Sequence, residues 1–144
     1  MEIFSPYIIA GLAGWVVSQA AKYVVASFKT RKLASYRQLY LSGNMPSAHS
    51  ATVIAVLVVV GLIDGIGSGL FGVMLVLASV VLYDAMMVRR SSGEQGVALT
   101  ALIKESKSDV PLPRVALGHT PLEVAIGALL GFFVGLATYF ITSL

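Results

Sequence analysis

The stretch Gly43-Asn44-Met45-Pro46-Ser47-Ala48-His49-Ser50 is short and polar, and it leads directly into an apolar run over residues 51–63. A proline at or near the first helical turn, with serines able to cap it, predicts that a helix begins here. A helix N-terminus presents unpaired N–H groups and the positive end of the helix dipole, which together favour the binding of an anion. We expect His49 on the first turn of this helix, beside that anion site.

A second segment repeats this arrangement near the end of the chain. His119 lies in Leu-Gly-His-Thr-Pro-Leu-Glu at residues 117–123, and a long apolar run follows it. The chain has two histidines in all, and both stand where a hydrophobic helix is predicted to begin. A shared function of the two histidines is therefore the first hypothesis.

The composition is that of an integral membrane protein. Of the 144 residues, 57% are hydrophobic and 12% are charged, whereas a soluble domain carries about 25% charged residues. We expect one domain over residues 1–144. The first apolar stretch is expected to be retained as a span, because no basic segment or small-residue cleavage site marks it as a signal peptide. The absence of cysteine excludes disulfides and thiol chemistry.

Four stretches are long and apolar enough, or nearly so, to cross a hydrocarbon core of about 30 Å. The sequence therefore predicts an all-α integral membrane fold with four transmembrane helices, polar connections and the site at one interface. The second span is short, and it reaches full length only if its Ser/His turn enters the interface. Gly127, Gly131 and Gly135 recur every four residues in the last span and predict a smooth face for close helix packing. The predicted spans are residues 3–25, 46–63, 70–88 and 121–141, with a tight turn at 64–69, polar connections at 26–45 and 89–120, and a short interfacial helix at 96–104.

The basic residues fall on one side of the predicted membrane. With four alternating spans, both polar connections share one face, and this face carries all ten Lys and Arg residues. Glu2 and Asp64 fall on the other face. Cytoplasmic loops carry an excess of Lys and Arg, so the connections are predicted to be cytoplasmic. The same alternation gathers Lys22, His49, Asp84, Arg89 and His119 at one interface.

Lys22, Asp84 and Glu123 lie inside predicted spans and are functional candidates, because ionisable residues are costly in a membrane. Neither Arg89 nor Arg90 is three or four residues from Asp84, so we expect its partner on another helix, with Lys22 as one candidate. Lys22 could instead extend its ammonium group from a helix end to the interface.

Glu123 fits two roles. Thr120-Pro121-Leu122-Glu123 has the pattern of a capping box, in which the glutamate reaches back to the N-cap backbone. Glu123 is also four residues after His119, a spacing at which a carboxylate can fix the imidazole tautomer and make the ring a better nucleophile. Two histidines could alternatively hold a metal, but no third ligand with suitable spacing accompanies them, so no metal site is predicted.

Three segments in order, MPSAHS (45–50), YDAMMVRRSSGEQ (83–95) and LGHTPLEV (117–124), resemble the divergent branch of the phosphatidic acid phosphatase/vanadium haloperoxidase superfamily. The usual superfamily pattern is K-x6-R-P, then P-S-G-H, then S-R-x5-H-x3-D. This chain has Lys for the first Arg, Ala for Gly and Glu for the last Asp. The corresponding residues are Lys22 and Lys29, Pro46-Ser47-Ala48-His49, and His119 and Glu123.

The resemblance implies a metal-independent lipid phosphate phosphatase that uses no cofactor. His119 would attack phosphorus to form a phosphohistidine, Glu123 would orient its ring, and His49 would protonate the leaving group. Arg114 is one residue too close to His119 to match the third motif, so Arg89 or Arg90 is expected to hold the phosphate instead. The substrate-binding residues expected are Lys22, Lys29, Ser47, Ala48 through its backbone N–H, Asp84, Arg89 and Arg90.

A site at the interface implies a substrate with its head group there and its tail in lipid. Phosphatidate, phosphatidylglycerophosphate and polyprenyl diphosphates all fit this description. The expected partners are therefore the lipid substrate and the bilayer, with no nucleic acid, and a homodimer is plausible because four spans offer little protein to enclose a site. Two alternatives stay open: a non-enzymatic membrane protein that binds anionic lipid head groups, and a degenerate family member that binds phosphate without hydrolysing it.

Overall fold

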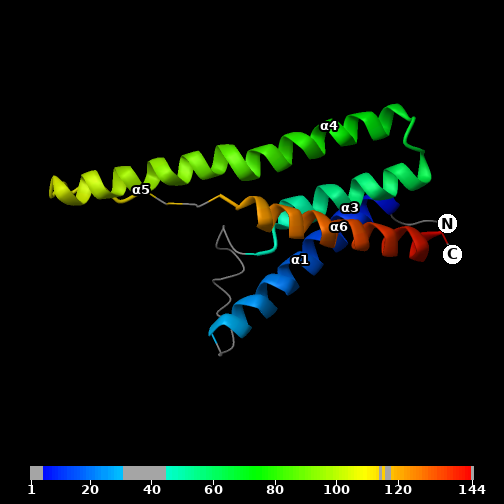
Figure 1. Cartoon of the computed structure of the whole chain (residues 1–144), viewed down its shortest axis with the longest axis horizontal. Helices are drawn as coiled ribbons and strands as arrows, with labels where there is room; N and C mark the ends of the chain where they lie inside the picture. Colours follow the sequence, from blue (N-terminus) through cyan, green and yellow to red (C-terminus); the bar gives the residue numbers. More distant parts are fainter. Residues whose placement is uncertain (1–4, 31–44, 114, 116–117, 144) are drawn as a thin grey trace.

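The computed structural model describes residues 5–30, 45–113, 115 and 118–143, with the backbone alone at residues 29 and 30. Within these residues the secondary structure is entirely helical (Figure 1), which confirms the predicted all-α fold. The elements are α1 (Pro6–Thr30), α3 (Ala48–Ile63), α4 (Gly69–Tyr83), the π-helical turn η1 (Asp84–Val88), α5 (Arg89–Glu105) and α6 (Pro121–Thr142).

The central helix is α3, which packs against α1, α4 and α6. Ser47, Ala51 and Ala55 are fully buried and follow one another at successive turns at its start. A Cβ atom on Gly127 would lie 2.5 Å from the Ser47 carbonyl oxygen, and one on Gly135 would lie 2.7 Å from the Ala55 carbonyl oxygen. The backbones of α3 and α6 are therefore in direct contact, which confirms that the glycine face of α6 serves helix packing.

One end of the bundle holds the start of α1, the α3–α4 turn and the end of α6 (Figure 1). There the Tyr7 hydroxyl donates to an Asp64 carboxylate oxygen at 2.6 Å. Ala10 and Val59 belong to a buried apolar cluster nearby, and Tyr139 packs against it. The opposite end holds the N-termini of α3 and α6, so the helices alternate in direction as predicted.

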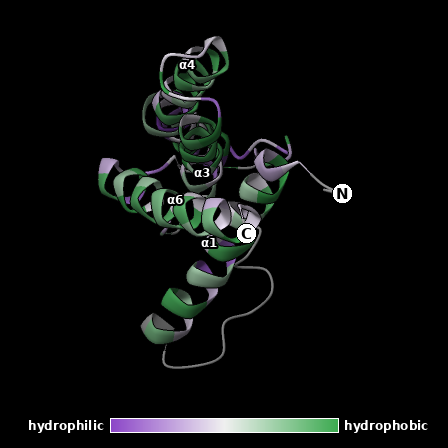
Figure 2. Ribbon diagram, turned by 90° about the vertical axis from the view of Figure 1, so that its right-hand side faces the viewer, coloured by the Kyte–Doolittle hydropathy of each residue, from purple (hydrophilic) through white to green (hydrophobic). Residues whose placement is uncertain are grey.

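Among the described residues, three helical segments are long and apolar enough to span a membrane: Pro6–Phe28, Gly69–Glu105 and Pro121–Thr142. The 16 residues of α3 reach about 24 Å, less than a hydrocarbon core of about 30 Å, as expected for a span whose polar first turn lies in the interface. Apolar colouring covers most of α3, α4 and α6 in Figure 2, and α4 exposes large side chains such as Val73, Val76 and Val80. Such extended apolar surfaces on hydrogen-bonded helices are those of an integral membrane protein.

The segments α4, η1 and α5 form one continuous helix of 37 residues, Gly69–Glu105. Our prediction of a separate short helix at 96–104 was therefore wrong, because the helix of the third span continues to Glu105. Residues 89–105 contain no proline and several strong helix formers. An exposed ion pair between Arg90 and Glu94, four residues apart at 3.2 Å, adds local support. As a result α5 continues in line with α4 and projects beyond the other helices (Figure 1).

Candidate functional site

Two backbone hydrogen bonds join the three sequence motifs at one end of the bundle. The Ser47 N–H donates to the Glu123 carbonyl oxygen at 3.2 Å, which links the start of α3 to the start of α6. The His119 N–H donates to the Ala85 carbonyl oxygen at 3.0 Å, which links the segment before α6 to η1. The motif residues that alternation was predicted to gather are thus fixed to one another by main-chain contacts.

The N-terminus of α3 is capped from within its own first turn. Ser47 is the N-cap, and its hydroxyl oxygen accepts from the Ser50 N–H at 3.4 Å and from the Ser50 hydroxyl at 2.9 Å. Pro46 directly precedes this cap. The N–H groups of Ala48 and His49 have no hydrogen-bond partner within the part of the chain that the structure describes. These two donors, at the positive end of the helix dipole, are suited to an anion.

His119 is 4% exposed and is held from both sides. Its Nδ1 lies 3.3 Å from Glu123 Oε2, and the same carboxylate oxygen accepts the Thr120 N–H at 2.9 Å. The Thr120 hydroxyl accepts the Glu123 N–H in return, so the predicted capping box is confirmed. The capping role and the contact with the imidazole therefore occur together. If Nδ1 carries the proton, the lone pair of Nε2 is available for chemistry.

The charge of His119 is set by competing neighbours. Burial lowers the pKa of His119 below its ordinary value of 6.5, and Lys22 and Arg89 lower it further, whereas Glu123 raises it. The net effect is a lowered pKa, which keeps the imidazole neutral at neutral pH. A neutral imidazole is the form that can act as a nucleophile.

His49 stands on the exposed side of the first turn of α3. It interacts electrostatically with Arg89, His119, Lys22 and Asp84. The five residues that the sequence placed at one interface are therefore neighbours in the structure.

Lys22 enters this cluster from α1. Its side chain is largely buried, at 7% exposed for the residue, and its ammonium group interacts electrostatically with Glu123. No hydrogen bond or ion pair to Lys22 is found within residues 5–30, 45–113, 115 and 118–143. Lys22 is thus a buried cation that interacts with the Glu123 carboxylate without forming an ion pair in the described part of the chain, and the alternative of an ammonium group extended into water does not fit this burial.

Asp84 pairs with Arg89 and not with Lys22. The Arg89 Nε donates to Asp84 Oδ2 at 2.7 Å. Our expectation of a partner on another helix was wrong, because it assumed α-helical spacing. In η1 the Arg89 N–H bonds to the Asp84 carbonyl oxygen, and a π turn of this kind brings residues five apart onto the same side of the helix.

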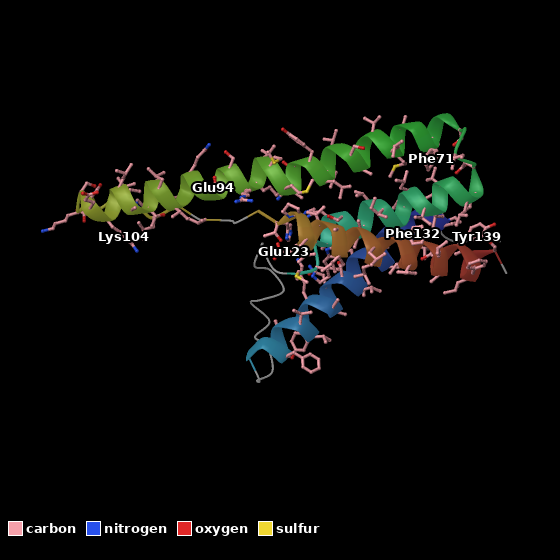
Figure 3. The ribbon with its side chains drawn as sticks, viewed as in Figure 1. Phe71, Glu94, Lys104, Glu123, Phe132 and Tyr139 are labelled. Atoms are coloured by element: carbon pink, nitrogen blue, oxygen red, sulfur yellow. The ribbon has the colours of Figure 1, made fainter. Side chains whose placement is uncertain are left out.

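The other predicted phosphate contacts differ in their placement. Arg90 pairs with the exposed Glu94 at 3.2 Å, and it is not among the groups that act electrostatically on either histidine. In Figure 3, Glu94 and Lys104 lie along the projecting α5, apart from Glu123 at the start of α6. Of the two arginines, Arg89 is therefore the one beside the histidines. The Lys29 side chain and all of Arg114 lie outside the described residues.

Three features of the site were not predicted from the sequence. Gly118 lies so close to the start of α5 that a Cβ atom there would stand 2.7 Å from the Arg90 Cα, and the glycine directly before His119 was a signal of this close approach. The Ala85 carbonyl oxygen has no side-chain signature at all. Gln19, three residues before Lys22, has a buried Oε1 atom without a hydrogen-bond partner among the described residues, and such atoms are uncommon in native structures.

No group of three or more His, Cys, Asp or Glu side chains arranged to hold a metal ion occurs within the described residues.

Comparisons with known proteins agree with the motif resemblance. The chain is 32% identical over 152 aligned positions to the uncharacterized membrane protein YuiD of Bacillus subtilis (strain 168), with 94% of this chain and 96% of that protein covered. No solved structure matches the chain. A family model described as the Divergent PAP2 family matches residues 4–134. Since this match covers most of the chain, the protein belongs to the Divergent PAP2 family.

Proposed function

We propose that this protein is a metal-independent phosphatase of lipid phosphates, which acts through a phosphohistidine intermediate at the membrane interface. The observation that carries the proposal is the clustering of His49, His119 and Lys22 at the N-terminus of α3, where Lys22 has no ion pair within the described residues. Membership of the Divergent PAP2 family supports a phosphatase-like reaction.

The charge balance of the cluster favours a phosphate ligand. A buried cation without a hydrogen bond or ion pair is unfavourable, and an anion bound beside Lys22 would supply such a partner. Arg89 adds a second cation, and the unpaired N–H groups of Ala48 and His49 add directed donors. Ser47 and Lys29 remain predicted contacts of the same phosphate, whereas Arg90 pairs with Glu94 away from the histidines.

In the proposed first step, the lone pair of His119 Nε2 forms a bond to phosphorus as the bond from phosphorus to the ester oxygen breaks. His49, protonated beforehand, donates its proton to the departing oxygen, so a lipid alcohol leaves from a phosphate monoester and a lipid monophosphate leaves from a diphosphate. Glu123 keeps the proton on His119 Nδ1 and stabilises the ring as it gains positive charge. Lys22 and Arg89 stabilise the negative charge on the non-bridging phosphoryl oxygens.

In the second step, His49, now neutral, takes a proton from a water molecule whose oxygen attacks phosphorus. The bond between phosphorus and His119 Nε2 breaks, and inorganic phosphate leaves. Both histidines then return to their starting protonation states, and no redox partner or cofactor is consumed.

The substrate class follows from the place of the site at the end of membrane-spanning helices. We propose a lipid with its phosphate at the interface, of the phosphatidate, phosphatidylglycerophosphate or polyprenyl diphosphate type. The excess of basic residues at this end supports a cytoplasmic site. A single cysteine introduced as Ser106→Cys, on the exposed end of α5, should react with an impermeant thiol reagent only after cells are opened; labelling of intact cells would contradict this orientation.

One observation favours the alternative that the site binds an anionic lipid head group without hydrolysis. Glu123 Oε2 is shared between the Thr120 N–H and His119, and its distance to the ring, 3.3 Å, is longer than that to the backbone, 2.9 Å. In this alternative Glu123 serves mainly as a cap, and the ring is not activated.

Release of inorganic phosphate from purified protein distinguishes the two functions. The protein would be presented with phosphatidate, phosphatidylglycerophosphate and a polyprenyl diphosphate in mixed micelles, with EDTA present throughout. The phosphatase proposal predicts release from at least one lipid, abolished in His119→Ala and unchanged in Ser79→Ala, whose hydroxyl bonds only within α4 in the described structure. Binding of these lipids without any phosphate release would favour the alternative.

A further inference from the structure

The long helix changes its hydrogen-bond register beside the candidate site. In η1 the Arg89 N–H bonds to the Asp84 carbonyl oxygen, five residues back. In a regular α-helix, residues five apart are turned about 140° away from each other, so their side chains could not meet easily. The π turn brings Arg89 back over Asp84, and the Nε–Oδ2 distance is 2.7 Å.

The contact uses one particular nitrogen of the guanidinium group. A guanidinium group has five N–H donors in a rigid planar fork. Asp84 accepts from Nε, and within the described residues the guanidinium has no other hydrogen bond. Both terminal nitrogens are therefore available to one ligand, and a phosphate group is well matched to such a pair of donors. Arg89 also acts electrostatically on His49 and His119, so a phosphate held by this pair of nitrogens would lie close to both histidines.

The same change of register connects Arg89 to His119. In an α-helix the Arg89 N–H would bond to the Ala85 carbonyl oxygen. Because it bonds to Asp84 instead, that carbonyl is not engaged by Arg89, and it accepts the His119 N–H at 3.0 Å. Gly118 packs tightly against the backbone of residues 89 and 90. The π turn thus fixes the position of Arg89 relative to His119.

We propose that Asp84 is a positioning residue, which holds Arg89 through Nε so that its two terminal nitrogens face the phosphoryl group of the substrate. This inference rests on the proposed function and revises the expectation that Asp84 itself binds substrate. A carboxylate would repel a phosphate dianion, so Asp84 acts through Arg89.

Exposure separates this role from a purely structural one. The side chains of Arg89 and Asp84 are 51% and 37% exposed, and an ion pair so accessible to solvent contributes little to stability. Loss of Asp84 should therefore change substrate binding much more than it changes thermal stability.

The test compares Asp84→Asn with a matched control, Glu94→Gln. Each removes one carboxylate charge from an ion pair with a neighbouring arginine on the same long helix, but Glu94 and Arg90 are exposed and apart from the histidines. We expect Asp84→Asn to raise KM, and to weaken inhibition by orthovanadate, on the order of tenfold to a hundredfold, as for a displaced substrate-binding group. Glu94→Gln should have the KM of the wild type and the same inhibition by orthovanadate. Asp84→Asn and Glu94→Gln should each keep the wild-type Tm.

A double mutant tests whether Asp84 acts through Arg89. In an Arg89→Ala background, adding Asp84→Asn should change KM and vanadate binding by less than about twofold, because the side chain to be positioned is gone. Equal values for Asp84→Asn and Glu94→Gln, or fully additive effects in the double mutant, would overturn the inference.

Orthovanadate binding to the purified protein, measured directly, separates this inference from the proposed function. If the wild type binds vanadate without releasing phosphate from any lipid, the proposed phosphatase fails, while weaker vanadate binding in Asp84→Asn still supports the positioning role. If the wild type neither turns over lipid phosphates nor binds vanadate, both proposals are overturned.

Discussion

Replacement of Glu123 by glutamine separates the two roles that this side chain combines. Glutamine can still accept the Thr120 N–H, so the capping box survives in Glu123→Gln. The neutral amide no longer holds the proton on His119 Nδ1 or stabilises a positively charged ring. If Glu123 orients a nucleophile, the variant should fold normally and turn over slowly.

The expected loss of rate follows from the geometry. In a serine protease, exchange of the orienting aspartate for asparagine lowers kcat by about 10⁴-fold. Strong charge-assisted hydrogen bonds measure about 2.7–2.9 Å, whereas Nδ1 and Oε2 here are 3.3 Å apart. We therefore expect a smaller loss of ~10²-fold in kcat, or about 2.7 kcal/mol of transition-state stabilisation.

Thr120→Ala is the matched control, because it removes the other half of the capping box. The Thr120 hydroxyl accepts the Glu123 N–H at 3.3 Å, and loss of such an N-cap costs about 0.5–2 kcal/mol of stability. The assay is steady-state phosphate release together with thermal unfolding in detergent. Thr120→Ala should lower Tm and keep the wild-type kcat, whereas Glu123→Gln should keep the wild-type Tm and lower kcat. A wild-type kcat in Glu123→Gln would mean that Glu123 serves only as a helix cap.

Four further predictions follow from the same structure. Burial and the nearby cations lower the pKa of His119, and the nucleophile must be neutral, so the acidic limb of the pH profile of kcat/KM should lie below pH 6.5. Arg89→Gln removes one of these cations and should move the limb to higher pH; an unmoved limb would contradict this assignment. Because the pKa of His119 is lower in the folded state than in the unfolded state, the unfolded state binds a proton at this residue more readily. The free energy of unfolding should therefore fall as the pH drops below about 6.5, as measured by Tm against pH. His49→Ala should lose most activity on lipid phosphates, by ~10²–10⁴-fold, yet still form phosphohistidine from an activated aryl phosphate whose leaving group needs no proton. If phosphohistidine formation were slowed equally with the lipid phosphate and with the aryl phosphate, His49 would not be the general acid. Gly131→Ala should destabilise the fold by about 1–3 kcal/mol, since its Cβ atom would meet the Ala51 backbone. The control Gly72→Ala, whose Cβ atom would have nothing within 4 Å, should be neutral or slightly stabilising. Equal Tm values for the two variants would contradict the packing of α6 on α3.

Much of this arrangement could be predicted from the sequence, because it depends on signals that are local in the chain. Ser47 and Thr120 mark helix starts through their capping chemistry, and the structure has caps at both. Alternation of apolar helices was then enough to bring His49 and His119 to one end of the bundle. The glycine spacing of α6 likewise predicted its close packing.

The features that escaped prediction depend on the backbone and not on side-chain pattern. A π turn is a shift of one residue in the hydrogen-bond register, and hydrophobic periodicity does not record it. The Asp84–Arg89 pair and the contact of His119 with the Ala85 carbonyl both depend on that shift. The continuity of α4 with α5 was missed for a related reason, since a polar surface helix and a polar connection have similar composition.

The most direct test of the central claim is to trap the covalent intermediate. Purified protein would be mixed with radiolabelled phosphatidate or another lipid phosphate that it hydrolyses, in EDTA, and quenched in alkali, followed by peptide mapping by mass spectrometry. We expect an alkali-stable, acid-labile phosphate on the peptide that contains His119, and none in His119→Ala. With an activated aryl phosphate as substrate, His49→Ala should accumulate more of this phosphopeptide than the wild type. Turnover of a lipid phosphate by His119→Ala at the wild-type rate, or a phosphate on any other residue, would contradict it.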